Sequence, residues 1–221
     1  MKISIIGAGN IGQALALRLV ERGHDVRIAN SRGVQTLADI ARQTGAQAGV
    51  PKDIVRGADV IVVTIPLKNV RDLPPDLFAG VPDTVTIIDT GNYYPQQRDG
   101  RIVEIEQGLP ESRWVEQQVK RPVVKAFNNI YAAHLRDKGV PSGKAGRIAL
   151  PVSGDNAASK AIVIGLVNDL GFDGVDAGPL DESWRQQPGS LVYGTDFDAA
   201  GVRNALNAAS PLRTAEWRAK A

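Results

Sequence analysis

Three glycines near the N-terminus, Gly7, Gly9 and Gly12, have the spacing GxGxxG. They follow a short apolar run at residues 2–6 and precede a helical pattern at residues 13–22. The first glycine permits a tight turn, the second lets bare backbone approach a ligand, and the third lets the helix pack on the strand. We expect each of them to resist a β-carbon. Amides at such a helix N-terminus bind phosphates, so the pattern predicts a dinucleotide pyrophosphate site.

The residues after the second predicted strand indicate which dinucleotide binds. A free ribose 2′-hydroxyl is usually read by Asp or Glu about 20 residues beyond the glycines. This chain has Asn30, Ser31 and Arg32 there. Arg32 can form charge-assisted hydrogen bonds with a 2′-phosphate, each worth roughly 1.5–3 kcal/mol, which favours NADP over NAD by about one to two decades. The alternative is that Arg32 is an ordinary solvated residue at a helix start.

Polar residues also follow three later strands. The predicted strand at residues 59–65 ends at Thr64, Ile65 and Pro66, since proline has no amide hydrogen to donate. Asn92 follows the next strand and Asn128 the one after it. Ligands of doubly wound sheets lie at the carboxyl ends of the strands, where the strand order reverses. We expect Thr64 and the backbone of Ile65 to flank the pyrophosphate and ribose, with Asn92 and Asn128 nearer the nicotinamide.

Hydride transfer between a nicotinamide and a flavin-like ring needs little from the protein beyond orientation and exclusion of water. Reduction of a carbonyl or imine also needs a proton donor. The candidates are Lys125, Tyr131 and His134, of which the last two lie three apart on a predicted helix and share a face. The structural alternatives are an ion-paired or surface lysine, a packed aromatic ring and a solvated histidine.

Three further residues lie near the expected nicotinamide end. Tyr93 and Tyr94 follow Asn92 in a loop, where they could stack on a planar acceptor or cover the core beneath. Asp89 ends a strand, and a carboxylate in that place more often accepts a hydrogen bond from a loop amide than takes a catalytic proton.

The elements that must position these residues follow from the apolar pattern. Runs of four to six apolar residues alternate with helical segments, and most lack an apolar/polar alternation. Strands buried on both faces have this character, so we predict an α/β doubly wound fold with a mostly parallel sheet. The expected strands are residues 3–6, 25–29, 47–50, 59–65, 84–89, 123–126 and 147–152, and the expected helices begin at Asn10, span 34–43, run from a cap at Asp155 to Gly171, and span 198–209.

The sequence changes character near residue 180. We predict a Rossmann-like NADP-binding domain at residues 1–180 and a small C-terminal segment at residues 181–221. Residues 184–197 mix aromatic, amide and glycine residues without strong periodicity, which suits a wall over a substrate. The C-terminal segment is therefore expected to shape the acceptor pocket or to form a dimer contact.

Composition excludes several classes of partner. The 221 residues have a formal net charge of only +2, and the Lys and Arg residues are scattered, so no nucleic-acid footprint is indicated. There is no cysteine, and the two histidines have no carboxylate nearby in sequence, so a metal site is not expected. The apolar stretches fall short of the roughly 18 residues that a membrane span needs. With a strand predicted from Lys2, we expect a cytoplasmic protein without a membrane partner.

Five segments together resemble the NADP oxidoreductase, coenzyme F-420-dependent family. The same pattern is similar to the cytosolic reductase domain of the six-transmembrane metalloreductases. The likeness runs from about residue 1 to about residue 180, in the right order and spacing. The segments are residues 7–12, 30–32, 64–66, 123–128 and 176–180.

The resemblance implies NADPH bound along the crevice and direct hydride transfer to or from a flavin, a deazaflavin (coenzyme F-420) or a similar planar acceptor. It implies that the pyrophosphate is bound at Gly9, Asn10 and Ile11 and that the 2′-phosphate is bound by Ser31 and Arg32. The ribose would lie along Thr64 to Pro66. The nicotinamide would lie beside residues 128–132, which end at Ala132. Deazaflavin-using members carry a histidine at the position of Asn128. The metalloreductase domain has an asparagine there, as this chain does, so the identity of the acceptor stays open.

Two other functions fit the same residues. One is a small imine or carbonyl reductase, which would depend on a proton donor such as Lys125 or Tyr131. The other is a redox sensor that binds NADP(H) without turnover and acts through a partner. A homodimer is the expected assembly in each case.

Overall fold

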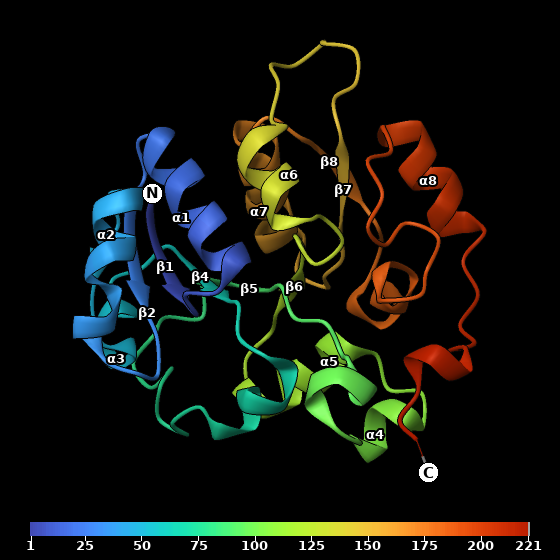
Figure 1. The fold of residues 1–221 in the computed structure, drawn as a ribbon, viewed down its shortest axis with the longest axis horizontal. Coiled ribbons are helices and arrows are strands. Elements are labelled where there is room, and N and C mark those ends of the chain that lie inside the picture. Colours follow the sequence, from blue (N-terminus) through green and yellow to red (C-terminus); the bar gives the residue numbers. More distant parts are fainter. Residues whose placement is uncertain (221) are drawn as a thin grey trace.

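The computed structural model describes residues 1–220 and contains a six-stranded parallel sheet with the strand order β3-β2-β1-β4-β5-β6 (Figure 1). The order reverses between β1 and β4, so the predicted doubly wound α/β fold is confirmed. The strands are β1 (Lys2–Ile6), β2 (Asp25–Ala29), β3 (Gln47–Ala48), β4 (Val60–Val63), β5 (Thr86–Asp89) and β6 (Val124–Lys125).

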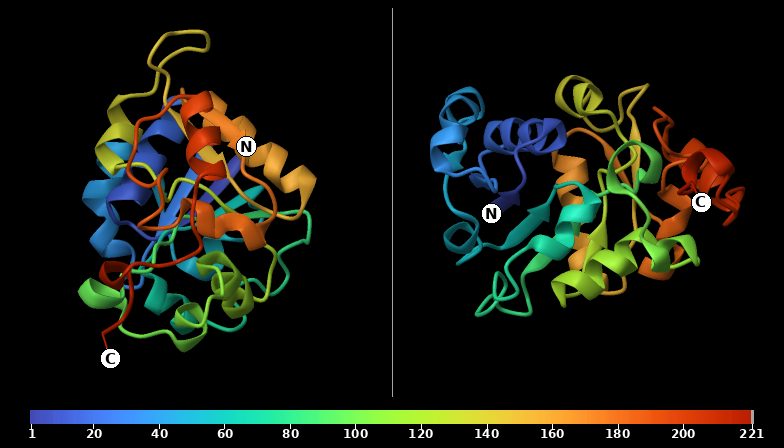
Figure 2. Two further views of the ribbon diagram at one scale, coloured as in Figure 1. Left: turned by 90° about the vertical axis from the view of Figure 1, so that its right-hand side faces the viewer. Right: turned by 60° about the horizontal axis from the view of Figure 1, so that its bottom comes forward.

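Helices cover both faces of this sheet (Figures 1 and 2). One face carries α1 (Asn10–Glu21), α6 (Ala132–Asp137) and α7 (Ala157–Asp169), with α2 (Ala38–Thr44) beside α1. The other face carries α3 (Pro51–Ile54), α4 (Val103–Glu106) and α5 (Glu111–Val119). Shorter helical turns are η1 (Val34–Leu37), η2 (Leu67–Asp72), η3 (Pro95–Asp99), η4 (Leu180–Gln186) and η5 (Ala215–Trp217).

Strand β4 shows why the apolar runs do not alternate. Val60 and Val62 pack into the core beneath α1 and α7, whereas Ile61 and Val63 pack into the core beneath α3 and α5. All four side chains are almost completely buried. A strand between two helical layers needs apolar residues at every position, which the sequence of this strand supplies.

A second, two-stranded parallel sheet follows the main one. It pairs β7 (Ala149–Val152) with β8 (Asp173–Asp176), and an antiparallel bridge between Lys125 and Ser153 joins it to β6. The predicted strand at residues 147–152 therefore forms, but outside the main sheet. Strand β8 was not predicted, because its sequence Asp-Gly-Val-Asp contains a single large apolar residue.

The C-terminal helix α8 (Ala199–Asn207) packs on this small sheet. Leu150 and Val152 of β7 face the core with α7, whereas Ala149 belongs to a third core with Val175 and Val202. The segment after residue 180 thus covers the side of β7 and β8 that α7 leaves free. The boundary at residue 180 stays a prediction.

Two local expectations need correction. The cap of α7 is Asn156, whose side chain accepts a hydrogen bond from Ser159 N, rather than Asp155. Asp155 instead accepts a hydrogen bond from Leu180 N at 2.9 Å and pairs with Arg113 at 2.7 Å. The predicted helix at residues 34–43 begins as the 3₁₀ turn η1 before it becomes α2.

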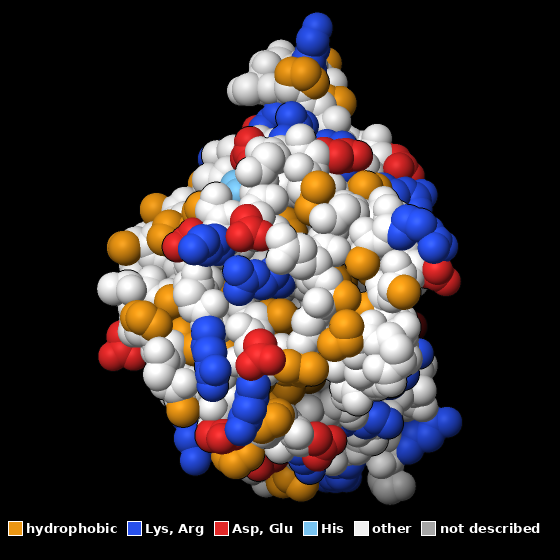
Figure 3. Space-filling model, turned by 90° about the vertical axis from the view of Figure 1, so that its left-hand side faces the viewer, with side chains coloured by type: hydrophobic (Ala, Val, Ile, Leu, Met, Phe, Trp, Pro, Cys, Tyr) orange, Lys and Arg blue, Asp and Glu red, His pale blue; other side chains and the backbone are white. Residues whose placement is uncertain are grey.

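The loop between α6 and β7 projects beyond the body of the molecule (Figures 1 and 3). On the face that Figure 3 shows, Lys and Arg side chains are interspersed with Asp and Glu, so no continuous basic stripe forms there.

Gly12 is required by packing within the chain, and this can be tested by stability. A β-carbon there would lie 2.1 Å from the Gly7 carbonyl oxygen, which is backbone and cannot move cheaply. We expect Gly12→Ala to lower the free energy of unfolding by about 2 kcal/mol or more, as overpacking does. In the control Gly165→Ala, the β-carbon meets nothing within 4 Å on an exposed part of α7, and about 0.5–1 kcal/mol should be gained. Urea unfolding measures both, and a neutral Gly12→Ala would contradict the packing argument.

Candidate functional site

The glycine turn is built on close contact between backbones. Gly7 has φ +121°, and a β-carbon there would lie 2.1 Å from the Thr64 carbonyl oxygen at the end of β4. Gly9 differs from Gly7 and Gly12: its φ is −78°, and a β-carbon would meet nothing within 4 Å. The expectation that all three glycines resist a β-carbon is therefore wrong for Gly9. Within this chain, only a bound group would require glycine at that position.

The N-terminus of α1 is open to such a group. Its N-cap is Gly9, no side chain caps the first amides, and the first turn contains no acidic residue. The Gln13 side chain donates to Ala8 O at 2.9 Å and so supports the turn without covering it. A helix of 12 residues with an uncapped N-terminus binds anions, because its free amides and dipole face the same way. The residues present therefore fit a dinucleotide pyrophosphate.

The turn after β2 holds the predicted 2′-phosphate residues. Asn30 shapes this turn, because its Oδ1 accepts from Arg32 N at 2.9 Å and its Nδ2 donates to Thr36 Oγ1 at 2.9 Å. Ser31 and Arg32 are exposed. Among residues 1–220, the Arg32 guanidinium has no hydrogen-bond or ion-pair partner, so it is free to bind an anion.

The other predicted crevice residues lie along the same edge of the sheet. Thr64 packs against the glycine turn, where its methyl group lies 3.0 Å from a β-carbon built on Gly12. Asn92 and Asn128 are joined by two hydrogen bonds, from Asn92 Nδ2 to Asn128 O at 2.8 Å and from Asn128 Nδ2 to Asn92 Oδ1 at 3.1 Å. The loops after β5 and β6 are thereby held together. Ile65 and Pro66 lie between these groups in sequence and are half-buried.

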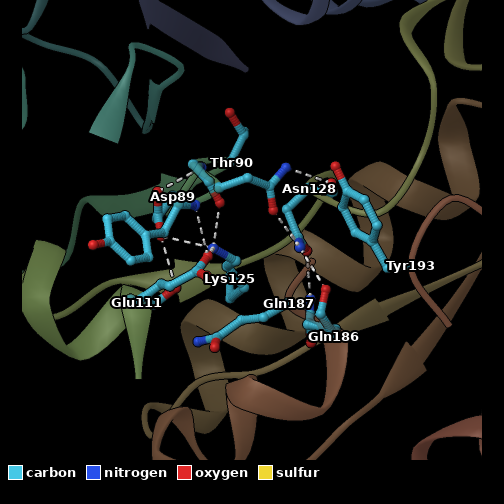
Figure 4. Close-up of polar contacts among 12 residues, drawn as sticks. Asp89, Thr90, Glu111, Lys125, Asn128, Gln186, Gln187 and Tyr193 are labelled. Carbon is cyan, nitrogen blue, oxygen red and sulfur yellow. Dashed lines mark hydrogen bonds and ion pairs between the residues drawn. The ribbon is translucent and has the colours of Figure 1, made fainter. Parts of the chain in front are cut away.

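Asn128 is engaged by the C-terminal segment (Figure 4). Its Nδ2 donates to Gln186 O at 2.7 Å, and its Oδ1 accepts from Gln186 Nε2 at 2.9 Å. Gln186 Oε1 in turn accepts from Ser153 Oγ at 2.8 Å. The Asn128 carboxamide thus joins the end of β6 to η4, so any contact with a nicotinamide falls to its backbone or to its neighbours.

The next residue, Asn129, falls within residues 128–132, which the family resemblance implies lie beside the nicotinamide. It is 1% exposed, and neither carboxamide atom has a hydrogen-bond partner among the described residues. Its backbone oxygen accepts from Gly194 N at 2.9 Å, so it lies beneath the C-terminal segment. An unpaired buried amide is costly, which makes Asn129 a candidate polar contact at this end of the crevice. No pattern in the sequence distinguishes it from Asn128.

Lys125 is completely buried at the end of β6 (Figure 4). Its Nζ donates to Gly91 O and lies 3.3 Å from Asp89 Oδ2 and 3.9 Å from Glu111 Oε2. Asp89 also accepts from Gly91 N at 2.7 Å and from Ser112 Oγ at 2.7 Å. This geometry favours the ion-paired structural lysine over a proton donor, because Nζ has no exposed path to a substrate.

Glu111 extends this network to the C-terminal segment. It has no exposed surface, accepts from Tyr93 N at 3.1 Å, and forms an ion pair with Arg213. Arg213 also donates to Gln187 Oε1 at 2.9 Å and lies over the Tyr93 ring at 5.3 Å. Burial raises the pKa of Glu111, while Lys125 and Arg213 act to lower it. Two cations and two carboxylates therefore hold the residue 210–218 segment against the loop after β5.

Tyr131 and His134 lie at the start of α6, together as predicted. Tyr131 is the N-cap and is 58% exposed, and its ring meets the His134 ring edge-on at 5.4 Å. His134 Nδ1 lies 2.7 Å from Asp196 Oδ1, and His24 Nε2 lies 3.0 Å from an Asp169 carboxylate. The fold therefore brings an aspartate that is distant in sequence to each of the two histidines.

Ala132, the first residue of α6, faces the glycine-turn side of the molecule. It lines a hollow of about 310 Å³ together with Asn10, between α1, α2 and α6. Two residues predicted to bind opposite parts of the cofactor thus share one hollow.

A larger hollow, of about 560 Å³, lies beside the C-terminal segment. Its walls come from the α4–α5 loop, from η4 and from residues 210–218, and include Trp184, Gln187 and Trp217. The Trp217 ring also lies 6.1 Å from the rings of Tyr94 and Tyr193. Aromatic residues of the C-terminal segment therefore meet the loop after β5.

Residues 1–220 contain neither a cluster of metal ligands nor a membrane-spanning helix. No group of three or more His, Asp or Glu side chains is arranged to hold a metal ion. No helix in that range combines the length and the apolar character that crossing a membrane requires.

Fold and site together define the class of NADP-dependent Rossmann oxidoreductases. The family model described as NADP oxidoreductase, coenzyme F420-dependent matches residues 2–93. A hypothetical protein from Sinorhizobium meliloti with a known crystal structure has 30% sequence identity to this chain. The two structures superpose with a TM-score of 0.74, and the match covers 89% of this chain and 95% of that one. Residues 2–93 therefore belong to the NADP oxidoreductase, coenzyme F420-dependent family.

Two further relatives extend the comparison. A protein from Arthrobacter sp. FB24, proposed to be an F420-dependent NADP-reductase, shares the fold at 24% identity and a TM-score of 0.67, over 81% of this chain and 86% of that one. The Escherichia coli protein YjhV is 39% identical over 87 residues, which is 39% of this chain. The match spans 56% of the length of YjhV.

The link between Arg213 and Glu111 predicts a pH-dependent loss of stability. In Arg213→Ala a buried carboxylate loses its partner, which costs about 3–5 kcal/mol in other proteins. The fold already raises the pKa of Glu111, and the loss of Arg213 raises it further. The unfolded chain releases this proton at the ordinary glutamate pKa of about 4.3, so the folded state loses stability as the pH rises above that value. We expect a larger loss at pH 8 than at pH 5.

Urea unfolding at both pH values measures this loss. The control is Arg203→Ala, an exposed arginine on α8 that contacts only the Ala199 carbonyl, which should change stability by less than about 0.5 kcal/mol. Equal losses for Arg213→Ala and Arg203→Ala would show that the ion pair does not hold the segment.

Proposed function

We propose that this protein transfers hydride between NADP(H) and a flavin, a deazaflavin or a similar planar acceptor. One arrangement carries the proposal: the uncapped N-terminus of α1 lies between the free Arg32 guanidinium at one end of the sheet edge and the loops after β5 and β6 at the other. Membership of an NADP oxidoreductase family supports NADP(H) as the nucleotide.

In this proposal each group of residues has one task. The backbone amides at Gly9, Asn10 and Ile11 bind the pyrophosphate, and Ser31 and Arg32 bind the 2′-phosphate. The ribose lies along the residues from Thr64 to Pro66, and the nicotinamide lies beside Asn92 and residues 128–132. When bound, NADP(H) supplies or takes the hydride, and the chain orients the two rings and excludes water.

The acceptor side is proposed to lie where the C-terminal segment meets the loop after β5. Trp184, Trp217 and Tyr94 offer aromatic faces there, beside the larger hollow. A small imine or carbonyl reductase is the second candidate, favoured by two tyrosine hydroxyls that meet at this place. A homodimer in the cytoplasm remains part of the proposal.

The role of Arg32 can be tested by nucleotide binding. Loss of its charge-assisted hydrogen bonds in Arg32→Ala should weaken NADPH binding by about 10- to 100-fold and leave NADH binding nearly unchanged. Arg42→Ala is the matched control, because Arg42 is equally exposed but pairs with Asp39 on α2. Calorimetric titration of both nucleotides gives the affinities. An equal loss for NADH and NADPH would contradict the assignment.

The hydride acceptor is tested by NADPH oxidation against FMN, FAD, coenzyme F-420, quinones and ferric chelates. We expect turnover with at least one planar two-electron acceptor and none with a ferric chelate alone, because a hydride moves as an electron pair. Tight NADPH binding without turnover on any acceptor would contradict the enzyme and favour a sensor. Failure to bind either nucleotide would remove the proposal altogether.

A further inference from the structure

Two tyrosine hydroxyls meet at the nicotinamide end of the proposed crevice. Tyr94 follows β5, and its backbone amide donates to Asp99 Oδ2 at 2.8 Å, which fixes the loop. Tyr193 belongs to the C-terminal segment, which is held over the end of β6 by the hydrogen bond from Gly194 N to Asn129 O at 2.9 Å. The two Oη atoms are in hydrogen-bond contact across 99 residues of sequence.

Aromatic and charged side chains surround this pair of tyrosines. The Trp217 ring lies 6.1 Å from both tyrosine rings, and the Arg98 guanidinium lies over the Tyr94 ring at 4.9 Å. Neither tyrosine is fully buried. Other titratable groups around the pair are Asp99 on the Tyr94 loop, Glu111 on α5 and Tyr131 at the start of α6.

The two hydroxyls can form their hydrogen bond in either direction. Burial raises the pKa of Tyr193, and the neighbouring Tyr94 hydroxyl raises it further, so Tyr193 stays protonated and can donate to Tyr94 Oη. When Tyr193 is the donor, the hydrogen of Tyr94 is left to bind a third group. The Arg98 guanidinium over the Tyr94 ring stabilises negative charge on that ring, which favours Tyr94 as the residue that gives up its proton.

We propose that Tyr94 donates a proton to the acceptor as it is reduced, and that Tyr193 is the residue that positions the Tyr94 hydroxyl. This inference rests on the proposed function and narrows the acceptor. The site would suit a planar molecule whose reduction by hydride leaves negative charge on an oxygen or nitrogen, such as a quinone.

The step balances without any further reactant. A hydride leaves the nicotinamide ring of NADPH with its electron pair, which oxidises NADPH to NADP⁺ and reduces the acceptor. The acceptor oxygen or nitrogen gains a negative charge, and the Tyr94 Oη–H bond breaks as a new O–H or N–H bond forms there. The tyrosinate stays hydrogen-bonded to Tyr193 until a water molecule returns the proton.

The test compares an acceptor that needs a proton with one that does not. Menadione takes a hydride and a proton, whereas the planar cation N-methylacridinium takes a hydride alone. We expect Tyr94→Phe to lower kcat with menadione by about 100-fold, in line with loss of a general acid, and to change kcat with N-methylacridinium by less than about threefold. Tyr193→Phe should lower kcat with menadione by about 10-fold while its KM and the NADPH affinity stay unchanged, since it acts through Tyr94.

The matched control is Tyr93→Phe, which removes a neighbouring phenol that faces Glu106 and Ile102 instead. It should slow both acceptors by the same factor, if at all. Equal slowing of the two acceptors in Tyr94→Phe, or none, would overturn the proton donor. Wild-type turnover with N-methylacridinium but not menadione would also overturn it and leave the hydride transfer intact. Turnover with neither would remove the proposed function, and this inference with it.

Discussion

The close contact between the glycine turn and the end of β4 is the constraint on which the rest of the carboxyl edge depends. Gly7 and Gly12 lie where a β-carbon would approach a backbone oxygen to 2.1 Å, so β1, α1 and β4 can pack this closely only with glycine at both positions. The α1 amides are thereby brought to the middle of the sheet edge. Gly9 completes the turn, but no contact within the chain requires glycine there, because a β-carbon would meet nothing within 4 Å.

A second constraint comes from buried charge. Lys125, Asp89 and Glu111 are almost fully removed from water and would be costly alone. Their mutual contacts and the Arg213 guanidinium satisfy them, and Arg213 comes from the last part of the chain. The Arg213 guanidinium compensates part of the buried negative charge. The same ion pair with Glu111 connects the C-terminal segment to the loop after β5. The aromatic residues that this segment carries are held against the loop after β5 as a consequence.

The fold followed closely from the sequence where local pattern decides structure. Apolar runs without alternation predicted the six strands of the main sheet, because a strand covered on both faces has no polar side to show. Strand β8 was not predicted, because its sequence Asp-Gly-Val-Asp contains no apolar run. It forms a small sheet by pairing with β7, and α8 packs on that sheet. Residues 30–32 and 64–66 were likewise predicted as site residues from their place after a strand.

The sequence by itself predicted the glycine turn and the strands that precede the expected site residues, because glycine spacing and apolar runs are local patterns. Only the tertiary structure decided what the side chains near β6 can do. Lys125 became an ion-paired core residue, the Asn128 carboxamide became a link to Gln186, and the hydroxyls of Tyr94 and Tyr193 came together. Contacts between residues 58 and 99 positions apart leave no periodic trace in a single sequence, since burial and pairing arise only when the segments pack.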